Sequence, residues 1–110
     1  MTMKASEILA KTLELWGPNG EHWTQGYLED GNSSYCLVGG LTKAAYGHAA
    51  YDLQGSRELR EAAHAVIKHS NANLIGFNDQ GSRAQTWPRV RNAVCKALKD
   101  CLEREADESS

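Results

Sequence analysis

The stretch SSYCLVGGLTKAAYG, residues 33–47, decides the fold. Between its serines and its closing glycine it carries a single charge, Lys43, and its apolar side chains fall on nearly every side of a helical wheel. A helix that is apolar all round is a buried helix. We therefore predict a helix over residues 35–46, capped by Ser33 or Ser34, as the central element of the core.

The paired glycines of this stretch, Gly39 and Gly40, are unusual inside a helix. Each costs about 1 kcal/mol of helix stability relative to alanine. Glycine is favoured where another segment must approach the backbone closely. We predict that a second helix, or the loop that contains Trp23, packs against this pair.

Three further helices are indicated by apolar residues recurring at helical spacing. The first covers residues 4–16 and is ended by the Gly-Pro pair at 17–18, and the next covers 57–69 with Ser56 as its N-cap. Thr86 is the predicted cap of the last helix, which reaches residue 103 and holds Pro88 in its first turn.

The connections between these helices are rich in turn-forming residues. The Asp-Gly pair at 30–31 predicts a short β-hairpin within residues 22–35. Residues 74–77 are predicted to be extended, and the acidic tail 103–110 to be frayed. The expected fold is mainly α: one small domain over residues 1–110, a four-helix orthogonal bundle with two long irregular connections.

Composition limits the classes of function. The chain has 110 residues, 41% of them hydrophobic, and a net charge of −2, so no global field draws it to nucleic acid or an anionic membrane. The longest apolar runs are far too short to cross a bilayer. Three cysteines without a CxxC spacing argue against a disulfide framework or a structural zinc site, and free thiols indicate a cytoplasmic protein.

Cys36 raises the question of a reactive thiol. A cysteine at a helix N-terminus is favoured as a thiolate. The order Cys36, then His64 or His69, then Asp79 also follows that of papain-like enzymes. Those enzymes mount the histidine on a sheet for which this chain has no room. We favour a buried, packing thiol and keep a thiol-dependent enzyme as the alternative.

The last predicted helix begins with a basic segment. Residues 80–99 contain five basic residues and no acid, whereas residues 100–108 contain five acids and one arginine. Pairs such as Lys96 with Asp100 are typical of a solvated helix face. Nucleic-acid binding through residues 83–99 is a weaker alternative. The predicted basic face consists of Arg83, Arg89, Lys96 and Lys99.

The four histidines lack the spacing of a metal site, since His64 and His69 are five residues apart. No metal or cofactor is predicted. Tryptophan on a loop either fills the core or anchors a partner. The loop residues that we take as candidates for partner binding are Trp23, Gln25, Asn78, Asp79 and Trp87.

Three short motifs carry a resemblance. HWTQG at 22–26, CLVGGL at 36–41, and GFND at 76–79 with TW at 86–87 resemble a family of small proteins without an established activity. That family occurs in actinobacteria and in bacteriophages of mycobacteria, and the resemblance covers residues 23–98. It implies a phage-encoded protein of the host cytoplasm. The predicted function is a non-enzymatic interaction module that binds a bacterial host protein.

Overall fold

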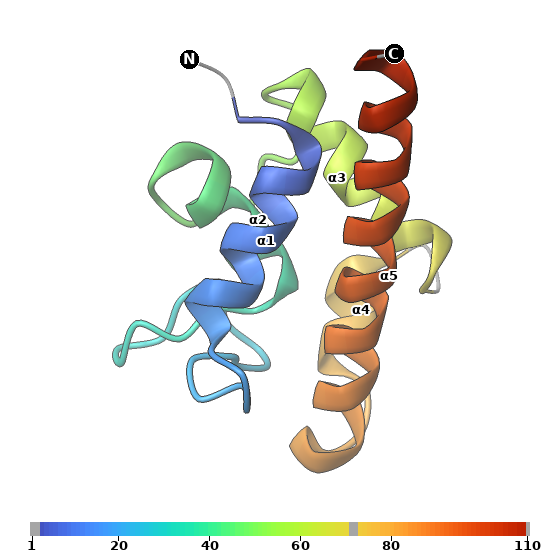
Figure 1. Ribbon diagram of the computed structural model, residues 1–110. Helices are drawn as coiled ribbons and strands as arrows, with labels where there is room; N and C mark the ends of the chain where they lie inside the picture. Colours follow the sequence, from blue (N-terminus) through green and yellow to red (C-terminus); the bar gives the residue numbers. More distant parts are fainter. Residues whose placement is uncertain (1–2, 71–72, 110) are drawn as a thin grey trace.

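The computed structural model describes residues 3–70 and 73–109, the side chain of Ser109 excepted. The prediction of a mainly helical chain is confirmed (Figure 1). The predicted four-helix orthogonal bundle is not confirmed, and the described residues form five helices. The helices are α1 (Ala5–Trp16), α2 (Leu37–Tyr46), α3 (Arg57–Lys68), α4 (Leu74–Asp79) and α5 (Arg83–Ser109).

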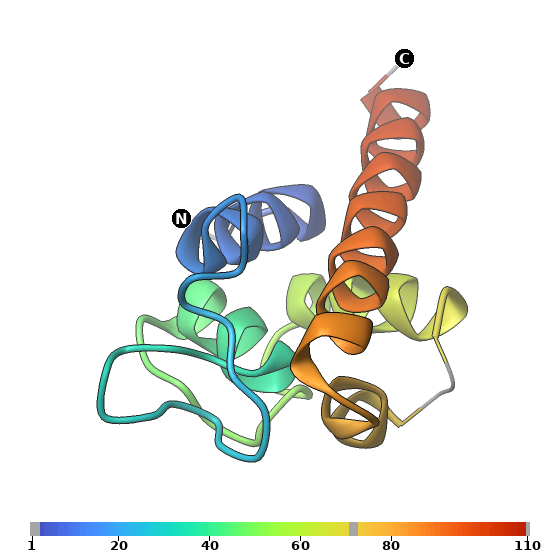
Figure 2. The same cartoon turned by 90° about the horizontal axis from the view of Figure 1, so that it is seen from below.

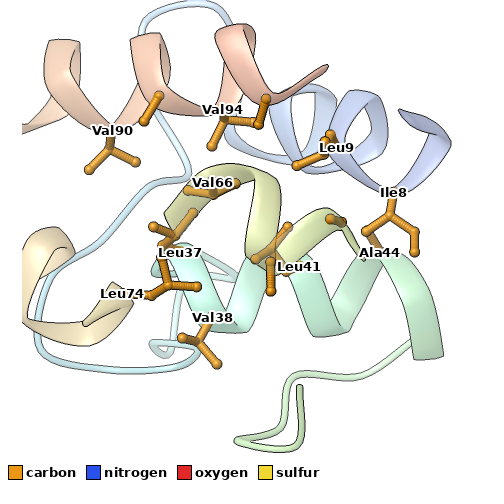
Figure 3. Packing of buried hydrophobic residues seen from close by; sticks show 14 of the residues in the cluster. Ile8, Leu9, Leu37, Val38, Leu41, Ala44, Val66, Leu74, Val90 and Val94 are labelled. Carbon is orange, nitrogen blue, oxygen red and sulfur yellow. The ribbon is translucent and has the colours of Figure 1, made fainter. Parts of the chain in front are cut away.

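Helix α5 runs along the length of the molecule and packs against α1, α3 and α4 (Figure 1). Helix α1 also covers α2 and α3, and α4 lies against α2. Residues 17–36 sweep round the start of α2, as the view from below shows (Figure 2). Every helix contributes to the core, in which the side chains labelled in Figure 3 meet: Ile8, Leu9, Leu37, Val38, Leu41, Ala44, Val66, Leu74, Val90 and Val94.

The predicted burial of α2 is confirmed, since residues 37–42 and Ala44 are all buried. Both glycines meet close neighbours, as predicted. A Cβ on Gly39 would lie 1.9 Å from the carbonyl oxygen of Leu28, and one on Gly40 would lie 2.9 Å from Thr12 Cγ2 of α1. Gly39 therefore admits the 17–36 loop, and Gly40 admits α1.

The start of α2 differs from the prediction. Cys36, not Ser33 or Ser34, is the N-cap, and its sulfur accepts a hydrogen bond from the Gly39 amide at 3.3 Å. Tyr35 is held in extended conformation because it exchanges backbone hydrogen bonds with His22 and Thr24. Helix α2 therefore begins two residues later than expected.

The predicted β-hairpin within residues 22–35 is wrong. Among the described residues only two isolated bridges occur, from Tyr35 to Trp23 and from Tyr35 to Glu29. Tyr35 pairs with both segments, so the loop folds back on a single residue instead of forming two paired strands. The carboxylate of Asp30 closes its tip by accepting the amides of Asn32 and Ser34 at 2.9 and 3.0 Å.

Residues 74–77, predicted to be extended, begin the short helix α4. The side chain of Asn73 caps it by accepting the Gly76 amide at 3.1 Å. The helix buries Leu74 and Phe77 against its neighbours. Apolar contacts with α2 and α5 thus supply the stability that six helical residues lack on their own.

Both predicted ends of α5 are wrong. The helix begins at Arg83, with the Ser82 hydroxyl accepting the Gln85 amide, so Thr86 is a buried helical residue and Pro88 lies beyond the first turn. At the other end the tail is helical to Ser109. It is held because the Glu105 carboxylate accepts both the amide of Ser6, at 3.1 Å, and its hydroxyl, at 2.5 Å. The acidic tail thereby caps the start of α1.

Candidate functional site

Most residues predicted to bind a partner converge in the structure, and they do so in a buried hydrogen-bond network. Its centre is the side chain of Asn78, which is 0% exposed at the end of α4. Its Oδ1 accepts Trp23 Nε1 at 2.6 Å and the Leu37 amide at 3.0 Å. Its Nδ2 donates to the Thr24 carbonyl at 3.1 Å and to Asp79 Oδ1 at 2.8 Å. The amide thus has partners for both lone pairs and both protons.

Gln25 and Asp79 extend this network to the surface. The Gln25 side chain donates to the carbonyls of Asn78 and Gly81 at 3.1 and 3.4 Å, and Asp79 accepts the Gly26 amide at 3.0 Å. Residues 22–26 are therefore fastened to residues 78–81 by side chains from both segments.

Arg83, predicted to belong to the basic face, also serves this network. Its guanidinium donates to the carbonyls of Trp23 and Gly20 and lies 5.2 Å from the centroid of the Trp23 ring. A guanidinium over an aromatic face is attracted by the ring quadrupole. Arg83 thus ties the 17–36 loop to the start of α5.

Burial decides what these residues do in the folded protein. Trp23 is 1% exposed and Asn78 is 0% exposed, so neither side chain can touch a partner while this network is closed. Gln25 is half-buried, and the exposed Asp79 has one oxygen engaged. The motifs HWTQG and GFND lie together because they build the fold.

Trp87 alone of the predicted aromatic anchors keeps part of its ring at the surface. Its ring meets Trp16 edge to face, with centroids 5.7 Å apart, and Trp23 at a tilt, with centroids 5.6 Å apart. The free part lies in a wide hollow of about 610 Å³. That hollow is lined by Pro18, Trp87, Pro88, Arg89, Arg91 and Asn92.

Cys36 is a packing residue by its geometry. It is 6% exposed, and its sulfur caps α2. Burial raises the pKa of the Cys36 thiol, although the nearby amides of Gly39 and Val38 act to lower it. A nucleophile needs the opposite shift.

His64 and His69, the histidines proposed for the alternative thiol-dependent enzyme, have environments that the structure defines. His69 Nε2 lies 2.7 Å from Asp100 Oδ2, and His64 is exposed on α3. His64 lines a hollow of about 340 Å³ between α3 and α5 together with Glu61, Lys68 and Arg104. Acids and bases are mixed there, and no group of His, Cys, Asp and Glu among residues 3–70 and 73–109 could hold a metal ion.

An apolar hollow of about 380 Å³ was not predicted from the sequence. Tyr51 and Ile75 stand at its edge, 71% and 45% exposed, and Leu74 lies at its base. Its lining comes from α2, α3, α4 and the loop before α3: Val38, Tyr51, Leu53, Ile67, Asn73, Leu74 and Ile75. The apolar run LIGF at 74–77 places apolar side chains in this segment, but its spacing does not show which of them stays at the surface.

The fold and these sites define a small helical protein built round a buried asparagine, with open hollows on its surface. The chain belongs to the family of unknown function DUF6197, whose model matches residues 1–104. The match therefore includes the first helix, which the resemblance had left outside. No curated protein and no solved structure matches the chain. In the described part of the chain, no helix is both long and apolar enough to cross a membrane.

Proposed function

We propose that this protein is a non-enzymatic interaction module that binds an apolar segment of a protein partner in the hollow at Tyr51 and Ile75. One observation carries the proposal. Among the described residues four large hydrophobic side chains are exposed, and two of them line this single hollow. Exposed apolar side chains that cluster at a concave surface are typical of binding sites.

The energetics favour an apolar occupant. Complete burial of a large aliphatic or aromatic side chain contributes about 1.5–3 kcal/mol of favourable free energy. The base of the hollow is rigid, because Val38 and Leu74 belong to the packed core. A partner that inserts one or two apolar side chains would cover Tyr51 and Ile75 and order little else.

The partner that we propose is a bacterial host protein, met in the host cytoplasm by a phage-encoded chain. The support for this part is the resemblance of the motifs at 22–26, 36–41 and 76–79. The thiol-dependent enzyme is not favoured, since the Cys36 thiol is buried and serves as a helix cap.

Affinity capture with matched variants tests the proposal. Ile75→Asp places a charge at the hollow, whereas Tyr27→Asp places one at a side chain that is 67% exposed and lies outside it. We expect wild type and Tyr27→Asp to retain the same protein from a mycobacterial lysate and Ile75→Asp to lose it. Circular dichroism checks that both variants are folded. Equal recovery by all three, or no specific protein at all, would contradict the proposal.

A further inference from the structure

The charged residues of α5 are distributed in the order that is unfavourable for the helix dipole. Five basic residues and no acid lie in residues 83–99, and five acids with one arginine lie in residues 100–108. The first turn has no acidic residue and the last turn has no basic one. The helix macrodipole favours the reverse order. The basic half of α5 is therefore not explained by helix stability.

Two of these cations flank the hollow at Trp87. Arg89 and Arg91 are exposed, and neither forms an ion pair with any residue in 3–70 or 73–109. No acid lines the hollow. The surface thus offers two free guanidinium groups beside an apolar centre of Trp87, Pro18 and Pro88.

The apolar centre is held rigidly. Trp87 packs against the rings of Trp16 and Trp23, both under 2% exposed. The backbone of Gly20 lies close to the same indole, since a Cβ at this position would lie 2.7 Å from atoms of the Trp87 ring. A rigid aromatic anchor costs little ordering on binding.

We propose that this surface binds an acidic peptide segment that carries an apolar side chain. Carboxylates would pair with Arg89 and Arg91, whose planar forks suit them, and the apolar side chain would pack on Trp87 and the two prolines. Protein is favoured over nucleic acid because only one ring is available for stacking and the net charge is −2. The site shares no residue with the hollow at Tyr51 and does not rest on the function proposed there.

Tryptophan fluorescence of the full chain tests this proposal. Trp16 and Trp23 are buried, so a change in emission on titration reports Trp87. The probes are a short Asp- and Glu-rich peptide with a central leucine, the same peptide with Asn and Gln, and oligothymidine. Of the three probes, we expect only the acidic peptide to bind saturably, and we expect added salt to weaken its binding.

Paired variants locate the site. R89Q with R91Q should weaken binding about tenfold, since each lost charge-assisted pair removes affinity directly. K96Q with K99Q removes the same charge from α5 outside the hollow and should change binding less than about twofold. All four side chains are exposed, so both variants keep the fold.

Three results would overturn the proposal. Equal binding of the acidic and the neutral peptide would show that charge plays no part, and tighter binding of oligothymidine would make the face a nucleic-acid site. The third concerns the acidic end of α5, residues 100–108, which carries the exposed Leu102. If sedimentation shows that the wild type forms a dimer and that the double variant R89Q with R91Q does not, the occupant of the hollow is a second copy of this chain.

Discussion

The indole nitrogen of Trp23 donates a hydrogen bond of 2.6 Å to the side chain of Asn78, across 55 residues of sequence. This contact joins the 17–36 loop to α4, and the same oxygen of Asn78 accepts the first amide of α2. One amide side chain therefore fixes the positions of three segments. A buried polar network whose members all have partners gives a fold a unique arrangement.

Asn78→Ala should be among the most destabilising substitutions in the chain. It leaves the Trp23 indole and the Leu37 amide buried without partners, at a cost of about 1–3 kcal/mol for each group. Asn73→Ala, at the exposed cap of the same helix, should cost only about 1 kcal/mol. Urea unfolding of the two variants measures the difference. Similar losses for both would mean that Asn78 is not the centre of the network.

Gly39→Ala should destabilise the protein although alanine favours helix. The new Cβ would lie 1.9 Å from the Leu28 carbonyl oxygen, a backbone atom, so the loop must shift, at a cost of about 1–3 kcal/mol. Gly76→Ala in α4, whose nearest neighbour would be 3.4 Å away, should gain about 0.5–1 kcal/mol. Thermal unfolding compares the two, and the prediction fails if Gly39→Ala also stabilises.

The three thiols should differ in reactivity. Cys95 is half-buried, whereas Cys36 and Cys101 are buried. We expect iodoacetamide to modify Cys95 in the folded protein and the other two only on unfolding, as peptide mass mapping would show. If Cys36 is modified as fast as Cys95 in the folded protein, the result would contradict this prediction and support the alternative of a reactive Cys36.

Alkaline pH should lower the free energy of unfolding through the buried Cys36. Burial raises the pKa of the Cys36 thiol above its ordinary value near 9.0. Above that value the unfolded chain releases the proton while the folded chain retains it, so the free energy of unfolding falls as pH rises toward the raised pKa. Cys36→Ala should reduce this loss. An unchanged pH profile would mean that burial of the thiol is not a cause.

The acidic tail should contribute to stability through Glu105. Glu105→Ala removes both hydrogen bonds to Ser6 and should cost about 1–2 kcal/mol, because a carboxylate at a helix N-terminus is favourable. Glu103→Ala, an exposed neighbour, should change stability by less than about 0.5 kcal/mol. Urea unfolding distinguishes them, and equal effects would show that the tail does not cap α1.

Local signals in the sequence were sufficient for most helices. Ser56 caps α3 as predicted, its hydroxyl accepting the Leu59 amide at 3.1 Å, and Gly17 ends α1. The sequence does not predict helix α4, because the four residues beginning at Leu74 show no helical period and its stability comes from tertiary contacts. It also does not predict the early start of α5, because Pro88 is typical of the first turn of a helix and points to a start near Thr86.

The sequence singled out the residues of the buried network but did not show their structural role, and it did not predict the hollow at Tyr51 and Ile75. Trp23 and Asn78 have side chains that suit a partner surface and a buried network equally well, and only long-range contacts decide between them. The hollow at Tyr51 and Ile75 is assembled from four separate elements. No local pattern reports which apolar residue of each stays outside.

Our central proposal is that a protein partner binds in the hollow at Tyr51 and Ile75, away from the buried network around Asn78. The most direct measurement is photo-crosslinking in mycobacterial cells, with benzoylphenylalanine replacing Tyr51 in one variant and Tyr27 in another. Both positions are exposed aromatic side chains, and only Tyr51 lines the hollow. We expect a defined protein adduct from position 51 and none from position 27. Adducts of the same protein at both positions, or at position 27 alone, would contradict the account.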